Sequence, residues 1–301
     1  MSNETNLQGG IEGLVAPPET YSNLTASFQG ERGAFSEDAA RKLLGQVQTV
    51  ACRTFEEMFD AVSSGAAHCA IVPIENSLAG SVYKNYELLM EHDLTILGEA
   101  KVRIVHNLIA PCGVSRGDIK RVYSHPVALA QCERFIRANP QIEVEAAYDT
   151  AGSVKMVIEN ERRDEAAIAG ATAAEVYGGR ILVEGIEDNP KNFTRFLLLA
   201  RPGDAAHITT LNPEGERKTS IVFRVANKPG ALFRALAVFA LRDIDLSKLE
   251  SRPIEGRPWE YSFYLDLTGD QGDPPIARAL GHLAEMAESI RILGSYPRSR
   301  E

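Results

Sequence analysis

The sequence has little of what marks secreted, metal-binding or membrane proteins. Its 301 residues include four cysteines, Cys52, Cys69, Cys112 and Cys132, and none of them forms a Cys-x-x-Cys pair. Scattered cysteines of this kind favour free thiols in a reducing compartment over disulfides or zinc ligands. No apolar run approaches the about 18 residues of a membrane span, and the polar residues 1–24 lack the pattern of a signal peptide. We therefore predict a cytoplasmic protein with a disordered leader over residues 1–24 and no contact with membranes.

Positive charge is also outnumbered by negative charge. Lys and Arg number 32 against 41 Asp and Glu, which gives a net charge of −9. A chain with this balance has no general affinity for nucleic acid, and it lacks the helix-turn-helix segment with a basic face that a DNA-binding regulator would need. An anionic ligand would therefore require a local site of basic or amide groups. The length and the hydrophobic content of 44% are those of a globular protein with about two domains.

Residues 25–201 repeat the order strand, polar turn, helix. One example is the apolar segment Cys69–Ile74, which runs into Glu75, Asn76 and Ser77. The repeated order predicts an α/β fold whose largely parallel sheet is covered by helices on both faces. The polar turns come at the carboxyl ends of strands, where such folds bind ligands. Three consecutive polar side chains are more than a helix cap requires.

The most informative stretch runs from Asn189 to Phe196 and leads directly into the apolar segment 197–200. Thr194 and Arg195 lie where this loop becomes a strand, so the strand fixes their position while the loop leaves them accessible. A hydroxyl group beside a guanidinium group can combine a proton donor with an anion-binding group. By itself the stretch would also fit a surface loop beside a strand.

Other polar residues in this part have plain structural interpretations. His106 is the lone histidine of the extended segment 95–110, and such a histidine is usually structural rather than catalytic. Asp149 and Thr150 precede a predicted helix and are candidate helix caps.

The character of the chain changes after residue 201. Residues 202–217 are rich in Gly, Pro, Asp and Asn without periodicity, which indicates a linker. The segment 218–296 then shows the order strand, helix, strand, strand, helix, strand, with a final edge strand expected near 290–293. This βαββαβ order is that of a ferredoxin-like domain.

Five motifs, in order, make the chain similar to a known family. Three blocks of the prephenate dehydratases, and of the closely related arogenate dehydratases, are matched by Val72-Pro73-Ile74-Glu75-Asn76-Ser77, by Tyr123-Ser124-His125-Pro126 with Ala130-Gln131-Cys132, and by Asn192-x-Thr194-Arg195-Phe196. The two motifs with which the ACT domain of this family holds phenylalanine resemble Gly230-Ala231-Leu232 and Glu250-Ser251-Arg252-Pro253.

The resemblance implies a two-lobed catalytic domain over residues 25–201, similar to type II periplasmic binding proteins. One lobe would consist of residues 25–103 and 185–201, and the other of residues 104–184. An ACT regulatory domain would occupy residues 218–296. The substrate would lie in the cleft between the lobes, where closure excludes water.

The resemblance further implies the decarboxylating dehydration of prephenate to phenylpyruvate, a step in the biosynthesis of L-phenylalanine. Aromatisation drives this reaction, so we expect neither a metal ion nor an organic cofactor. Thr194 would be the catalytic proton donor. The residues expected to bind the substrate are Glu75, Asn76, Ser77, Ser124, Gln131, Asn192, Arg195 and Phe196.

Phenylalanine would act as the effector and lower the activity. The family holds it between two ACT domains, so we expect self-association into a dimer or a tetramer. The residues expected to bind it are Asn227, Pro229, Gly230, Ala231, Leu232, Glu250, Ser251, Arg252 and Pro253.

Two alternatives remain open. Arogenate carries an ammonium group where prephenate has a keto group, and its dehydration would form L-phenylalanine directly. One acidic or amide residue could decide between the two substrates, and the sequence does not locate it. A non-enzymatic, two-lobed ligand-binding sensor would share the fold, although binding alone does not require the Thr194-Arg195-Phe196 motif.

Overall fold

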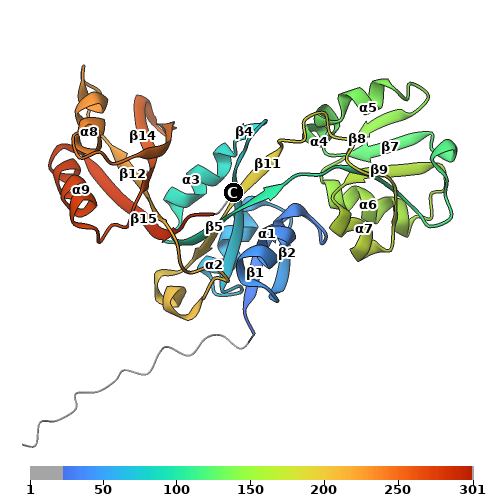
Figure 1. Ribbon diagram of the computed structural model, residues 1–301, viewed down its shortest axis with the longest axis horizontal. Helices are drawn as coiled ribbons and strands as arrows, with labels where there is room; N and C mark the ends of the chain where they lie inside the picture. Colours follow the sequence, from blue (N-terminus) through green and yellow to red (C-terminus); the bar gives the residue numbers. More distant parts are fainter. Residues whose placement is uncertain (1–22, 300–301) are drawn as a thin grey trace, which may run out of the picture.

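The structure, a computed structural model, describes residues 23–299 of the chain. It is elongated, with a first lobe in the centre, a second lobe on one side and a C-terminal domain on the other (Figure 1). Residues 1–22, which hold almost all of the predicted leader, lie outside the described residues.

The first lobe is built on a sheet with the strand order β2-β1-β3-β11-β5, and β4 pairs with the end of β3. Strands β1, β2 and β3 are parallel, whereas β11 lies antiparallel between β3 and β5. The chain leaves this lobe after β5 and returns to it through β11, the strand that carries Thr194. The bounds are β1 Thr25–Gln29, α1 Phe35–Leu44, β2 Gln48–Cys52, α2 Phe55–Ser63, β3 Cys69–Asn76, β4 Gly80–Ser81, α3 Tyr83–Glu91, β5 Thr95–Arg103 and β11 Phe193–Ala200.

The local sequence explains these elements. The first four residues of β3 are buried in succession, as expected for a central strand with helices on both faces. Thr54 begins α2 by accepting the N–H of Glu57 (3.2 Å), and the Glu57 carboxylate accepts the N–H of Arg53 (2.8 Å). The first bond satisfies an N–H group that the first turn of the helix leaves free, and the second fixes the residue before the cap.

The second lobe has the strand order β10-β6-β9-β7-β8. Strands β7, β8 and β9 are parallel, and β6 is antiparallel to both β9 and β10. The bounds are β6 Asn107–Ala110, η1 Arg116–Asp118, β7 Arg121–Ser124, α4 Pro126–Gln131, α5 Glu133–Arg137, β8 Glu143–Ala146, α6 Thr150–Glu159, β9 Glu165–Ala169, α7 Ala171–Tyr177 and β10 Arg180–Val183.

The two lobes contact each other beside the strands that connect them. Gly33, in the turn after β1, has a φ of 83°, and a Cβ atom there would lie 2.6 Å from the Cα atom of Ala173. Only glycine permits this approach. Close by, Thr172 Oγ1 donates to Asp38 Oδ1 (2.7 Å). The lobes are therefore closed against each other on this side.

The C-terminal domain has an antiparallel sheet in the order β13-β14-β12-β15, as in ferredoxin-like folds. One face of the sheet packs against α8 and α9, and the other face packs against the first lobe. The bounds are β12 Arg217–Arg224, α8 Ala231–Ala240, β13 Leu246–Ile254, β14 Arg257–Thr268, α9 Pro274–Met286 and β15 Ser289–Pro297, and the preceding linker contains η2 Pro202–His207.

Strand β15 is longer than the edge strand predicted near residues 290–293. It runs beside β5 of the first lobe, where Thr95 Oγ1 donates to the carbonyl oxygen of Leu293 (3.1 Å). A Cβ atom at Gly294 would collide with the backbone of Ile96, so a glycine is needed there. Packing between domains, rather than local pattern, sets the length of this strand.

Within residues 23–299, no helix is long and apolar enough to cross a bilayer. In the same range, no group of three or more His, Cys, Asp or Glu side chains is placed to hold a metal ion. The four cysteines are free thiols, and Cys112 is the exposed one.

Candidate active site

A cavity of about 530 Å³ lies between the two lobes. Strand β11 contributes Thr194 and Phe196 to its wall, β3 contributes Asn76, and the end of α4 contributes Gln131. Its mixture of apolar and polar walls is typical of a small-molecule site. The other lining residues are Gln29, Ala34, Phe35, Ser36, Phe55, Pro73, Ala79, Gly80, Ser81, Val82, Ile104, His106, His125, Val127, Ala128, Tyr148, Asp149 and Thr150.

A chain of hydrogen bonds joins Thr194 to the second lobe. Asn76 Nδ2 donates to Thr194 Oγ1 (2.9 Å) and to Asn192 Oδ1 (2.8 Å). Asn192 Nδ2 donates to Gln131 Oε1 (2.8 Å), which also accepts from His106 Nε2 (2.9 Å). Because Asn192 and His106 are buried, these bonds form in a water-poor setting where each one fixes its partners firmly.

This chain orients the hydroxyl group of Thr194. Because Oγ1 accepts an amide proton from Asn76, the hydroxyl proton of Thr194 is available to a group in the cavity. Asn76 is itself held in place, since its Oδ1 accepts the N–H groups of Leu78 (3.0 Å) and Ala79 (2.8 Å). A threonine hydroxyl is a weak acid, so proton donation by Thr194 would depend on this placement.

His106 belongs to the cavity wall, although its sequence context favoured a purely structural role. Its ring is 2% exposed and packs edge-on against Phe35, with ring centroids 5.8 Å apart. Burial lowers the pKa of His106, and the hydrogen bond with Gln131 and the charge of Glu187 oppose this effect only in part. The buried Nδ1 atom has no hydrogen-bond partner within residues 23–299.

Along the described part of the chain, no Lys or Arg side chain lines the cavity. The first residues of α1 and α6 line it instead, through Phe35, Ser36 and Thr150. Backbone N–H groups at a helix start carry partial positive charge and bind anions. For an anionic ligand in this acidic protein, the sequence predicted a local site of either basic or amide groups. The cavity is lined by amide groups.

Five of the eight predicted substrate-binding residues lie outside the cavity wall: Ser124, Ser77, Asn192, Glu75 and Arg195. Ser124 is fully buried and donates to a backbone carbonyl group of β9 (2.6 Å). Ser77 bonds the backbone of the segment that leads into β11. Asn192 lies one step behind the wall, within the hydrogen-bond chain. Glu75 faces the C-terminal domain, where its carboxylate lies 3.1 Å from Lys248 Nζ.

Arg195 also lies away from the cavity, which does not agree with the prediction that its guanidinium group binds the substrate. Successive side chains of a strand point to opposite faces, so Arg195 leaves the face that carries Thr194 and Phe196. Its Nε lies 2.6 Å from Glu99 Oε2, and one terminal nitrogen lies 2.6 Å from Asp266 Oδ2 of the C-terminal domain. Its side chain is 11% exposed.

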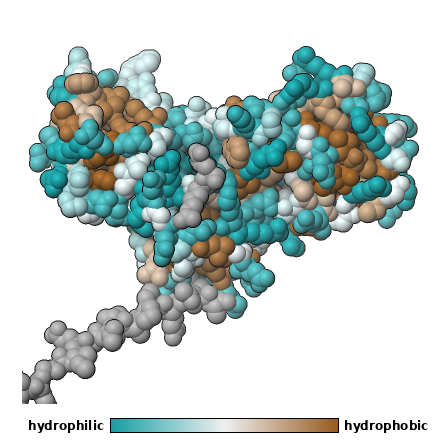
Figure 2. All heavy atoms as spheres, in the orientation of Figure 1, coloured by the Kyte–Doolittle hydropathy of each residue, from teal (hydrophilic) through white to brown (hydrophobic). Residues whose placement is uncertain are grey.

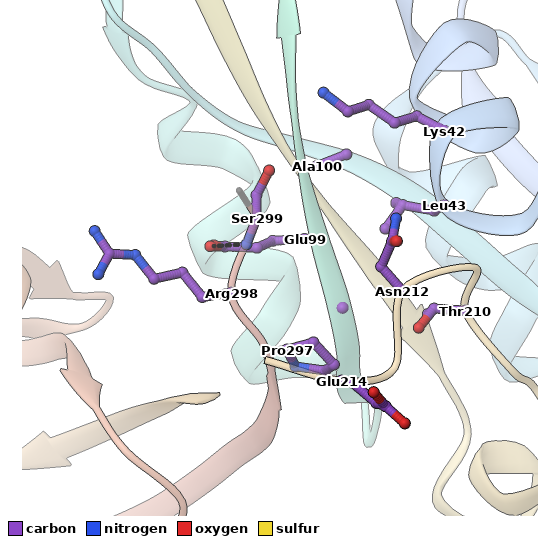
Figure 3. Close-up of a pocket in the computed structure, with 11 residues that line it drawn as sticks. Lys42, Leu43, Glu99, Ala100, Thr210, Asn212, Glu214, Pro297, Arg298 and Ser299 are labelled. Carbon is purple, nitrogen blue, oxygen red and sulfur yellow. Dashed lines mark hydrogen bonds between the residues drawn. The ribbon is translucent and has the colours of Figure 1, made fainter. Parts of the chain in front are cut away.

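We call Arg195, Glu99, Lys218 and Asp266 the interface cluster. Lys218 Nζ lies 3.0 Å from Glu99 Oε1. Burial alone would raise the pKa of Glu99, but the charges of Arg195 and Lys218 outweigh it and hold that pKa below its usual value. From the other side, Ser299 N donates to Glu99 Oε1 (3.0 Å), at the edge of a small cavity (Figure 3). Two positive and two negative side chains thus balance in the interface, as buried charges require.

The residues predicted to hold phenylalanine fall into two groups. The first group is at the start of α8, where Asn227, Ala231 and Leu232 line a cavity of about 90 Å³ together with Trp259. Gly230 is the N-cap residue of this helix, and Pro229 precedes it in the turn.

The second group lies on β13 and contacts the first lobe. Glu250 Oε2 accepts a hydrogen bond from Ser81 Oγ (2.7 Å), and the guanidinium group of Arg252 lies 4.1 Å from the ring centroid of Tyr83. Their neighbours Ser251 and Pro253 pair with β14. None of the residues 250–253 lines the cavity at α8, so a single chain does not unite the two groups there.

Two cavity residues that sequence reasoning did not assign to the site are His125 and Asp149. Both stand between a strand of the second lobe and the helix after it, which is the setting that the sequence predicted for Glu75 to Ser77. A polar residue between a strand and a helix could therefore have been predicted as a candidate site residue. This position alone does not show which of the turns faces the cleft, because that depends on how the two lobes pack.

Two α/β lobes around a cleft, followed by a ferredoxin-like domain packed on one of them, define a two-lobed ligand-binding fold with an attached regulatory-type domain. Family sequence models agree with this architecture: Prephenate dehydratase matches residues 26–204 and ACT domain matches residues 219–284. The chain belongs to the prephenate dehydratase family, whose activity is that of a hydro-lyase. The predicted family, fold class and enzyme class are confirmed.

Known proteins with similar sequences and structures support this assignment. The chain is 43% identical to arogenate dehydratase/prephenate dehydratase 2 of Arabidopsis thaliana over 92% of this chain and 73% of that protein. A prephenate dehydratase from Arthrobacter aurescens, solved in complex with L-Phe, is 34% identical with a TM-score of 0.82, covering 91% of this chain and 90% of that one. A structure described as GqqA, a novel type of quorum quenching acylase, is 38% identical with a TM-score of 0.82, covering 91% and 98%.

The same comparison shows that the predicted cytoplasmic location is wrong. The Arabidopsis relative at 43% identity is named as chloroplastic, and so are two further Arabidopsis relatives at 41% and 44% identity. The prediction rested on scattered cysteines and on the missing pattern of a secretory signal peptide. Neither feature distinguishes the cytoplasm from another reducing compartment.

Proposed function

We propose that this chain catalyses the aromatising loss of carbon dioxide and water from prephenate or arogenate. The bond between the ring and its carboxylate breaks, and its electron pair enters the ring. The ring hydroxyl group leaves as water after it receives a proton, so no oxidant or reductant is needed. The observation that supports this proposal most directly is the Thr194 hydroxyl group, held by Asn76 (2.9 Å) in a cavity lined by amides.

In this proposal, Thr194 donates the proton to the departing hydroxyl group, and Asn76 fixes the direction of that donation. Gln131 and the helix starts of α1 and α6 bind the carboxylate groups of the substrate. Phe35 and Phe196 pack against the ring and exclude water, which favours loss of the ring carboxylate.

A turnover assay on prephenate and on arogenate tests the activity. We expect aromatic product from at least one substrate, and we expect Thr194→Ala to lower kcat by about 100-fold or more. Its melting temperature should change little, because Asn76 keeps its hydrogen bond to Asn192 Oδ1. Thr194→Ser restores a hydroxyl group and should recover part of the rate. A normal kcat in Thr194→Ala, or no product from either substrate, would contradict the proposal.

Two other activities are less well supported. The likeness to a protein described as a quorum quenching acylase raises amide hydrolysis, which commonly uses a hydroxyl or thiol nucleophile next to a histidine. In the cavity wall, His106 bonds Gln131 and His125 bonds a backbone N–H, and neither bonds a hydroxyl or thiol group. Two histidines elsewhere do bond a hydroxyl group, in the pairs Thr25–His68 and Ser63–His92, but none of these residues lines the cavity. A ligand-binding sensor that catalyses no reaction would not need a Thr194 hydroxyl group oriented by Asn76.

We further propose that phenylalanine binds where two ACT domains meet and lowers the activity. The support comes from the two separate groups of predicted effector residues, because a second copy of the chain can supply the group that the first one lacks at α8. The similar structure from Arthrobacter aurescens holds L-Phe. Phenylalanine added to the turnover assay should lower the rate and favour a dimer or a tetramer. No change in either would contradict this part.

A further inference from the structure

The cavity between the lobes has an unusual set of charges for a site that takes a dicarboxylate. Within residues 23–299, Asp149 is the only acidic side chain in its wall, and neither Lys nor Arg contributes to it. The other ionisable side chains in the wall are those of His106, His125 and Tyr148. A dianionic substrate gains nothing from a carboxylate here, so the presence of Asp149 needs a reason beyond anion binding.

Only one of the two carboxylate oxygens of Asp149 is used to cap a helix. Its Oδ1 accepts the N–H of Gly152 (2.7 Å) and thereby caps α6. Asparagine, serine or threonine would cap a helix start equally well without a negative charge. Its Oδ2 reaches towards the first lobe, since a Cβ atom at Gly30 would lie 3.0 Å from it. No Lys or Arg of the described residues forms an ion pair with it.

The surroundings of this carboxylate make it receptive to a cation. Burial raises the pKa of Asp149, and the nearby charge of Glu31 acts in the same direction, while the Gly152 N–H and His125 oppose the shift. The Glu31 carboxylate is occupied by Lys155 Nζ (3.0 Å) and by the Tyr148 hydroxyl group (2.8 Å). A partly buried carboxylate that has no Lys or Arg partner is costly, and a ligand ammonium group would reduce that cost.

We propose that Asp149 is the residue that selects arogenate over prephenate, by accepting the ammonium group of the arogenate side chain. This inference rests on the proposed dehydratase function. The two substrates differ only at that position, where arogenate has three N–H donors and prephenate has a keto oxygen. The carboxylate attracts the ammonium group and repels the keto oxygen. One residue therefore strengthens the binding of arogenate and weakens the binding of prephenate.

The position of Asp149 in the cavity agrees with this role. The ring hydroxyl group of either substrate lies across the ring from the carbon atom that bears the side chain. With the hydroxyl group at Thr194 on the first lobe, the side chain extends towards the second lobe. Asp149 and the start of α6 line the cavity from that lobe. The helix N–H groups can then bind the side-chain carboxylate beside the ammonium group.

Asp149→Asn tests the proposal because it keeps the cap and the shape of the side chain but removes the charge. We expect wild-type kcat/KM to be higher for arogenate than for prephenate. In the variant, the ratio of the two kcat/KM values should shift towards prephenate by roughly 10- to 100-fold, mostly through the arogenate value. Asp149→Ser, which also caps a helix, should give the same shift if the first variant is poorly folded.

Glu31→Gln is the matched control, since it removes a nearby negative charge that does not line the cavity. Its substrate ratio should stay within about threefold of the wild-type value. An equal loss for both substrates in Asp149→Asn, or an unchanged ratio, would overturn the proposal while leaving the dehydratase function intact.

A binding measurement separates the two proposals when turnover fails. Calorimetric Kd values for arogenate and prephenate are compared in Thr194→Ala with and without Asp149→Asn. Loss of arogenate affinity on removal of the charge supports the role of Asp149 even without turnover. Equal affinities in the two proteins overturn it.

Discussion

At the scale of a single residue, the burial of His106 predicts a measurable pH dependence of the folding stability. Its ring is 2% exposed, its Nε2 donates to Gln131, and its pKa lies below the usual value of 6.5 because burial disfavours the charged ring. The unfolded chain therefore binds a proton at this residue at a higher pH than the folded chain does. Folding stability must fall as the pH drops below about 6.5, until the folded-state pKa is reached.

We expect His106→Gln to weaken this dependence. The urea midpoint of the wild-type protein should decrease between pH 7 and pH 5, and the decrease should be smaller in the variant. The control His282→Gln changes an exposed histidine of α9 and should leave the dependence as in the wild type. An equal decrease in His106→Gln and in the wild type would show that this ring does not cause it.

The residues of the site differ in how far the sequence could predict them. The joint position of Asn76 and Thr194 followed from the motif resemblance, and the structure brings the two side chains together. The direction of Arg195 was predictable but was read wrongly: in a strand, the residue after one that faces the cavity faces away from it. Asp149 was read only as a helix cap, because its approach to the first lobe depends on how distant segments pack.

At the scale of the element, β11 connects the cavity to the ACT domain. One face of this strand presents Thr194 and Phe196 to the cavity, and the other presents Arg195 to the interface cluster. Most of the order of elements in both domains could be read from the sequence, since period and turn residues are local signals. The short strand β4 and the division of residues 95–110 into β5 and β6 were not predicted. The extension of β15 along β5 could not be predicted, because it depends on contact between domains.

We expect Arg195→Met to destabilise the fold rather than to weaken substrate binding directly. Glu99 keeps Lys218 as a partner, but Asp266 loses its cation inside the interface. Breaking such a buried pair costs about 3–5 kcal/mol, which urea denaturation can measure. The control Arg298→Met breaks the surface pair with Glu216 (3.3 Å) and should cost less than about 1 kcal/mol.

The kinetic result distinguishes the two roles that Arg195 could have. With the guanidinium group in the interface, the folded fraction of Arg195→Met should bind substrate with a KM close to that of the wild type. A stable variant whose KM rises by 10-fold or more would instead place this group at the substrate, as the sequence had suggested.

At the scale of the whole molecule, the ACT domain is joined to the wall of the cavity. Lys248 pairs with Glu75 (3.1 Å), and Ser81, which lines the cavity, donates to Glu250 (2.7 Å). Two residues of β13 thus hold the β3–β4 hairpin that borders the site. Under the proposed regulation, a ligand that moves β13 would act through these two contacts on the hairpin that carries Asn76.

The outer side of the ACT domain, by contrast, is left uncovered. Figure 2 shows apolar surface gathered over the part of this domain that carries α8. On and next to this helix, Phe233 is 76% exposed and Leu241 is 83% exposed, and their spacing of eight residues places them along one side. Large exposed apolar side chains that gather on one surface commonly mark an interface between chains, which agrees with the proposed contact between two ACT domains.

Substitution of this apolar side tests the proposed contact at the level of the assembly. Phe233→Glu and Leu241→Glu should each shift the protein to a monomer in analytical ultracentrifugation, because a charge would be buried without a partner. Both variants should keep the basal rate, since the cavity between the lobes lies in the other domain, but they should lose most of the inhibition by phenylalanine. Leu211→Glu, at a residue of the linker that is 58% exposed, serves as the control and should change neither property. Monomers that phenylalanine still inhibits would mean that one ACT domain binds the effector alone, and the two groups of predicted effector residues would then have to act separately.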